Sequence, residues 1–70
     1  MRIKYFEDTD TTLVELSTNP AVETRELNEN LFIDLDTEGQ VVSITIEHAG
    51  QRADMKEFFY QRIPADVAAT

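Results

Sequence analysis

The chain has 70 residues and a net charge of −8, from fourteen acidic and six basic side chains. A chain of this length forms one domain at most, and an acidic field repels nucleic-acid backbones and anionic membrane surfaces. With no cysteine, a disulfide framework and a thiolate metal site are excluded.

Membrane insertion and secretion are also not expected from the sequence. No apolar stretch approaches the ~20 residues that span a bilayer. The residues after Met1 alternate between polar and apolar types, and they lack the apolar run of a signal peptide. We therefore expect a soluble, cytoplasmic protein.

The first predicted element is a hairpin. Residues 2–6 alternate, with Ile3 and Tyr5 on one side, and residues 11–16 alternate again after an acidic turn at 7–10. Pro20 breaks the chain next, because proline cannot donate a hydrogen bond inside a central strand. Residues 22–27 carry several charges, which suits a strand at a sheet edge.

Residues 31–36 and 41–47 are the clearest strands, and their register can be argued. Apolar side chains alternate in both, at Leu31, Ile33 and Leu35 and at Val42, Ile44 and Ile46. Both sets reach one core only if Asp36 lies opposite Val41, which leaves residues 37–40 as a four-residue loop. Gly39 then supplies a positive φ near the end of the loop.

A helix is predicted after this hairpin. Asp54 and Glu57 have the spacing of a capping box, Met55, Phe59 and Ile63 recur at helical spacing, and Pro64 ends the pattern. The predicted fold is therefore α+β: a small antiparallel sheet of about five strands, a meander of hairpins, with one C-terminal helix. Residues 1–64 form the single domain and residues 65–70 a frayed tail.

The loop Asp34-x-Asp36-x-Glu38-Gly39 has the spacing of the first calcium ligands of an EF-hand. The position that requires a bidentate Glu holds Thr45, which cannot supply two carboxylate oxygens. The flanks have the period of strands, whereas EF-hand loops lie between helices. We therefore predict an acidic hairpin loop and no metal site.

The sequence also contains no arrangement typical of catalysis. His48 is the only histidine, and no cysteine nucleophile, G-x-S-x-G turn or phosphate-binding glycine loop accompanies it. We predict no enzymatic activity, no catalytic residues and no cofactor.

Four apolar residues lie outside the predicted core, on the opposite face of the sheet. They are either scattered exposed side chains, which are common, or a patch that binds a partner or a second copy. The predicted partner-binding residues are Phe6, Leu13, Phe32 and Val41.

The ordered series of short segments resembles the YuzE-like proteins, a bacterial family of unknown function. The resemblance covers residues 1–58, and the chain departs from the family pattern at Leu13, Ser43, Thr45 and Gly50. Some members are encoded beside small toxins, so the resemblance implies an antitoxin-like role. The matching segments are Tyr5-Phe6-Glu7, Thr9-Asp10, Leu13–Ser17, Val22–Glu26, Asp34–Asp36, Gly39, Val41-Val42 and Ile46–Ala49.

Three functions remain open at this stage. The first is a non-enzymatic protein-interaction module, antitoxin-like, that binds a basic protein or a second copy. The second is an acidic inhibitor that mimics a nucleic-acid surface. The third is a metal-binding protein that uses Asp34, Asp36 and Glu38.

Overall fold

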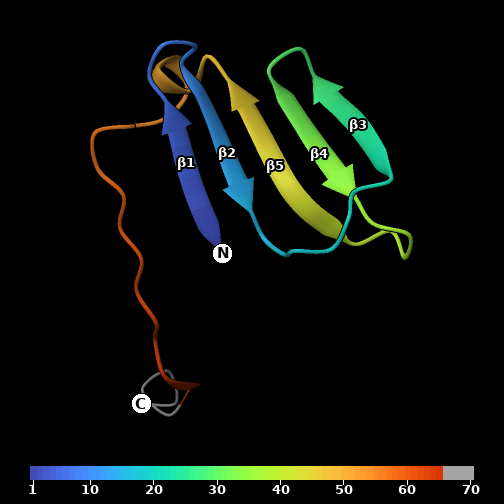
Figure 1. Cartoon of the computed structure of the whole chain (residues 1–70). Helices are drawn as coiled ribbons and strands as arrows, with labels where there is room; N and C mark the ends of the chain where they lie inside the picture. The colour runs from blue at the N-terminus through green and yellow to red at the C-terminus, as the bar shows by residue number, and fades with distance from the viewer. Residues whose placement is uncertain (66–70) are drawn as a thin grey trace.

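The computed structural model describes residues 1–65, and its only layer is one antiparallel sheet (Figure 1). The strands are β1 (Arg2–Phe6), β2 (Thr11–Glu15), β3 (Glu23–Asn28), β4 (Leu31–Leu35) and β5 (Val41–Glu47). Their order across the sheet is β1-β2-β5-β4-β3. The expected meander is wrong, because β5 inserts between β2 and β4 and the link from β2 to β3 crosses the end of the sheet.

The strand register sorts the side chains onto two faces, because directly opposite residues of antiparallel strands share a face. We call one side of the sheet the apolar face. It contains the pairs Ile3↔Val14, Val14↔Ile44 and Ile33↔Ile44. We call the opposite side the mixed face. It contains the pairs Lys4↔Leu13, Leu13↔Thr45 and Phe32↔Thr45. The apolar face is formed by Ile3, Tyr5, Val14, Leu31, Ile33, Leu35, Val42, Ile44 and Ile46, with Thr12 among them.

The predicted register of the β4–β5 hairpin is confirmed from Leu31↔Ile46 to Asp34↔Ser43. A bulge then shifts it, so that Val41 pairs with Leu35 and not with Asp36. The shift has a local cause: the Asp36 carboxylate accepts hydrogen bonds from the backbone N–H groups of Glu38 and Gln40, both at 2.9 Å. This closes the loop around Asp36, and Gly39 takes the predicted positive φ, at 79°.

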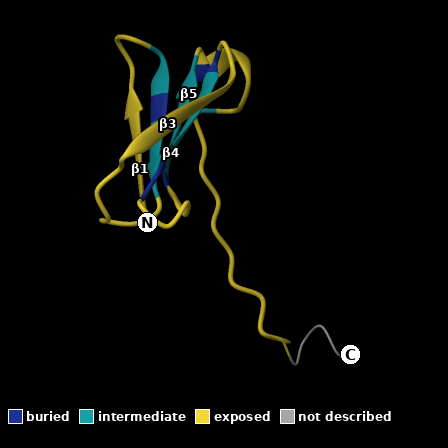
Figure 2. Ribbon diagram, turned by 90° about the vertical axis from the view of Figure 1, so that its right-hand side faces the viewer, coloured by how far each residue is buried: buried dark blue, intermediate teal, exposed yellow. Residues whose placement is uncertain are grey.

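The predicted C-terminal helix is wrong, and so is the α+β class. After a 3-10 turn at Ala49–Gln51 (η1), residues 52–64 form no helix and lead away from the sheet (Figures 1 and 2). At the predicted capping box, the Asp54 carboxylate instead accepts a hydrogen bond from the Lys56 N–H at 3.0 Å, which is a local Asx-type turn and begins no helix.

The failure of this helix has a physical reason. A helix of about ten residues is unstable in water unless one face packs against other structure, and the three consecutive aromatic residues Phe58, Phe59 and Tyr60 are weak helix formers. Phe58, Phe59 and Ile63 keep 67%, 76% and 67% of their surface exposed. Of the predicted tail, residues 66–70 lie outside the described part of the chain.

The buried core is very small. Among the described residues, the buried apolar side chains are Leu35, Val42 and Ala49. Most other side chains of the central strands are half-buried, whichever face they occupy (Figure 2). Domains are normally built from two packed layers, whereas residues 1–65 supply only one. Within residues 1–65, no helical segment has the length and apolar character needed to cross a bilayer.

Candidate functional site

The apolar face is the largest continuous apolar surface that the strand register creates. The three central strands, β2, β5 and β4, place no charged side chain on it, and charges enter only at the β3 edge through Glu23 and Arg25. One residue of the C-terminal segment reaches it: Met55 is half-buried, and its sulfur accepts a hydrogen bond from the Thr12 hydroxyl at 3.7 Å.

Further along, the C-terminal segment only approaches one corner of the apolar face. Met1 and Ile3 lie with Phe58 and Tyr60 around an open hollow of about 470 Å³. Tyr60 is 68% exposed, so the hollow is not a closed cavity. Elsewhere on the face, Leu35 and Val42 are buried beside the β2–β3 link, whose backbone N–H groups donate hydrogen bonds to their carbonyls. The side chains between these regions, among them Ile33 and Ile44, stay half-buried.

The mixed face carries three of the four predicted partner-binding residues. Leu13 on β2 and Phe32 on β4 flank Thr45 on β5, and Phe6 lies on the same face at the β1 edge. Val41 is separate from them: it lies four residues from Thr45 along β5, beside the bulge, and pairs with Leu35. The structure thus groups Phe6, Leu13 and Phe32, and it leaves Val41 apart.

Polar side chains on the mixed face bind one another across the strands. Asp34 accepts hydrogen bonds from the hydroxyls of Thr24, at 2.5 Å, and Ser43, at 2.6 Å. These two donors, Ser43 above all, lower the pKa of the Asp34 carboxyl below its usual value. Toward β1, Lys4 forms an ion pair with Glu15 at 2.9 Å, which lowers the pKa of Glu15.

The acidic residues of the calcium-like spacing do not come together as ligands. Asp34 is on the mixed face, whereas Asp36 is in the loop and 7% exposed. The second oxygen of Asp36 accepts a hydrogen bond from the Asn19 amide at 3.0 Å. Its backbone and side-chain donors lower the pKa of Asp36, with Gln40 the strongest. Among residues 1–65, no three acidic or histidine side chains form a group that could hold a metal ion.

A second polar cluster joins the β1–β2 turn to η1, and the sequence did not reveal it. The Asp10 carboxylate accepts hydrogen bonds from the Tyr5 hydroxyl at 2.5 Å and from the Gly50 N–H at 2.9 Å. The Tyr5 bond lowers the pKa of Asp10 and raises that of Tyr5. Asp10 lies in the predicted local turn, and in addition its carboxylate binds Gly50, forty positions along the chain. A positive φ of 55° at Asp10 accompanies this contact.

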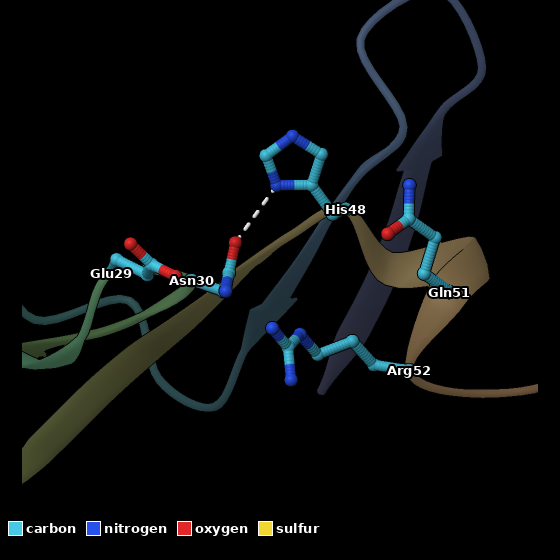
Figure 3. A pocket seen from close by; sticks show the side chains of 5 residues that line it. All are labelled: Glu29, Asn30, His48, Gln51 and Arg52. Atoms are coloured by element: carbon cyan, nitrogen blue, oxygen red, sulfur yellow. Dashed lines mark hydrogen bonds between the residues drawn. The ribbon is translucent and has the colours of Figure 1, made fainter.

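The only histidine lies beside this cluster and lines a polar hollow of about 400 Å³ (Figure 3). His48 has a positive φ of 56°, and its Nδ1 lies 2.8 Å from the Asn30 side-chain oxygen. The buried Asn30 also accepts a backbone hydrogen bond from Glu47, so this contact fastens the β3–β4 turn to the end of β5. The hollow is lined by Glu29, Asn30, His48, Gln51 and Arg52.

The contacts at this hollow connect the β3–β4 turn to the end of β5. Figure 3 shows the Gln51 side chain on the far side of His48 from Glu29, and it marks one side-chain hydrogen bond, between His48 and Asn30. A catalytic histidine needs a nucleophile or a second acid–base group within hydrogen-bond reach. The side-chain partner of His48 is the Asn30 amide, whose oxygen lies 2.8 Å from Nδ1 and holds the ring in place.

Comparison with known proteins gives one match. A family model described as "Protein of unknown function (DUF2283)" matches residues 2–49, which span all five strands and the start of η1. No curated protein and no solved structure matches the chain.

Proposed function

Since the chain belongs to the DUF2283 family of proteins of unknown function, we propose that it is a small, non-enzymatic protein-interaction module that acts in the cytoplasm. One observation supports this proposal most strongly. The sheet has a single layer, so Leu13 and Phe32 stand on the mixed face with no layer packed over them among residues 1–65.

The mixed face has the anatomy of a contact surface. Leu13, Thr45 and Phe32 form one row, which continues to Lys4 on β1 and Glu26 on β3. An apolar centre with a polar rim is the usual composition of a protein interface. Because the whole chain carries −8, the partner that this face accepts best is a basic protein, whose approach the negative field accelerates.

We further propose that the chain is a YuzE-like protein and that its partner is a small protein toxin. The resemblance of the sequence supports this antitoxin-like form of the role. An antitoxin of this kind needs no catalytic group, because it inactivates its partner by covering it. Val41 lies apart from the row and is proposed only as a contact at its margin.

The test is capture of partners from the native cell, followed by mass spectrometry, with three forms of the chain. The wild-type chain should retain a basic protein, and Phe32→Asp should lose it. Val22→Asp is the matched control: it adds the same charge at a 60% exposed position outside the strands and away from the row of Leu13 and Phe32, and it should retain the partner. Retention by Phe32→Asp would contradict the proposal.

The acidic inhibitor is the second candidate, and the position of the charges favours it. The mixed face also carries Glu15, Glu26, Asp34 and Glu47. If these charges imitate phosphates, Glu26→Gln with Glu47→Gln should release a nucleic-acid-binding protein that Phe32→Asp still retains. The metal-binding alternative has no such support, because the Asp34 and Asp36 oxygens already accept hydrogen bonds from the protein.

A further inference from the structure

The apolar face, which is not the surface proposed for the basic partner, is the largest feature that the molecule leaves unexplained. Isoleucine, leucine and valine from four strands meet on it, and its buried members are Leu35, Val42 and Thr12. An apolar face of a sheet is normally buried against a second layer. Met55 covers only the neighbourhood of Thr12.

We propose that a second copy of this chain covers the apolar face, so that two sheets pack face to face as a sandwich. In such a dimer the two layers lie about 10 Å apart and their strands cross at a small angle. The two-fold symmetry requires that one surface be complementary to itself. The apolar face meets this condition, because its central strands carry no charge that would meet its own copy.

The exposed area agrees with this occupant. The chain exposes 5802 Å², whereas a folded monomer of 8.0 kDa is expected to expose about 4,450 Å². The excess, roughly 1,350 Å², is larger than the ~800 Å² that each partner buries in a standard interface, and it includes the surface of the extended C-terminal segment.

The distribution of charge also favours a second copy over another protein on this face. The net charge of −8 resides on the mixed face, the loops and the edges, which point away from the interface in a sandwich. A basic partner would gain little from a face whose one acidic side chain, Glu23, lies at the β3 edge beside the basic Arg25. The two mixed faces of the dimer remain outward, so each copy keeps its proposed partner surface.

The absence of cysteine from the chain permits a direct test, because a single introduced cysteine can cross-link only to another copy. Ile44→Cys places a thiol at the centre of the apolar face, and Thr45→Cys places one on the mixed face one residue away. With a short bismaleimide, purified Ile44→Cys should give a covalent dimer, and Thr45→Cys should not. Sedimentation of the wild-type chain should give twice the mass of 8.0 kDa.

Three results would overturn the proposal. Equal cross-linking of both variants would place the interface elsewhere. A wild-type monomer whose Ile44→Cys thiol is shielded from maleimide would mean that the chain's own C-terminal segment covers the face. A monomer with a reactive thiol would mean that another protein covers it. Each result leaves the capture experiment with Phe32→Asp intact, so failure of the dimer is distinguishable from failure of the proposed function.

Discussion

The two faces of the sheet satisfy their side chains in different ways. On the mixed face, Asp34 binds two hydroxyls and Lys4 pairs with Glu15, so its polar groups find partners within the sheet. The apolar face has only dispersion and the hydrophobic effect, which require that another surface remove it from water. A single layer can therefore satisfy polar groups of its mixed face by itself, whereas apolar side chains on either face leave water only by contact with another surface.

The largest expected effect comes from removing a buried side chain on the apolar face. Leu35 is 5% exposed, and Leu→Ala at buried positions costs about 2–5 kcal/mol. Leu35→Ala should therefore remove most of the stability of a domain this small, as measured by urea unfolding. Phe32→Ala, on the mixed face, removes a half-buried ring and should cost less. An equal loss from both variants would show that the faces do not differ in this way.

The separation of the faces depends on the loop that sets the β4–β5 register. Gly39 has a φ of 79°, and an added Cβ there would meet nothing within 4 Å. The effect of substitution is therefore conformational, and Gly39→Val should destabilise by about 1–2 kcal/mol. Gly39→Asn should be much milder, because asparagine tolerates this region. Similar small shifts in the urea midpoint for both variants would rule out this account.

Salt should affect the two proposed contacts in opposite directions. Two copies of a −8 chain repel each other, so screening by added salt should strengthen the sandwich dimer. A basic partner on the mixed face is attracted by the same charge, and salt should weaken its binding. Sedimentation and a binding titration across a salt series measure both trends. A dimer that dissociates as salt is added would contradict the assignment of the interface to the uncharged face.

Acid should weaken the mixed face through Asp34. The two hydroxyl donors lower the pKa of Asp34 in the folded state, so its contribution to stability is complete above the unfolded value of about 3.9. It is lost as pH falls through the folded-state pKa. The stability difference between wild type and Asp34→Asn should therefore shrink below that window. Urea unfolding at pH 7 and pH 3, at one protein concentration, measures it; a constant difference would contradict it.

Of all these changes, adding calcium should have the smallest effect: we expect no change in the melting temperature. Ligands for calcium must be free carboxylate and carbonyl oxygens, and Asp36 uses both of its carboxylate oxygens to hold the loop. Thermal melts in EDTA and in millimolar calcium should agree. A rise of several degrees with calcium would mean that the loop rearranges to bind it.

The sequence predicted those features that local patterns determine. Alternation located the strands, and the spacing of Leu31, Ile33 and Ile44 gave the register that the structure confirms as far as Asp34. The bulge was missed because it depends on the side-chain bonds of Asp36. The helix was wrong because the spacing of Met55, Phe59 and Ile63 says nothing about whether a surface is available to pack on.

Features that depend on distant pairing were not predictable. Strand order is one, because β2–β5 contact joins segments that no turn connects. The Asp10–Gly50 contact is another. Of the predicted partner-binding residues, alternation correctly placed Phe6, Leu13 and Phe32 on one face, whereas Val41 depended on the missed bulge. Whether these residues bind a partner stays a prediction.

The central position of β5 has a consequence for synthesis on the ribosome. β2 and β4 are joined only through β5, which is the last strand to be made. Until Glu47 has emerged, the nascent chain can form only the two separate hairpins β1–β2 and β3–β4, and isolated hairpins are marginally stable in water. The sheet therefore assembles in one late step, when β5 enters between them, and a chain that stops before Val41 has no sheet to form.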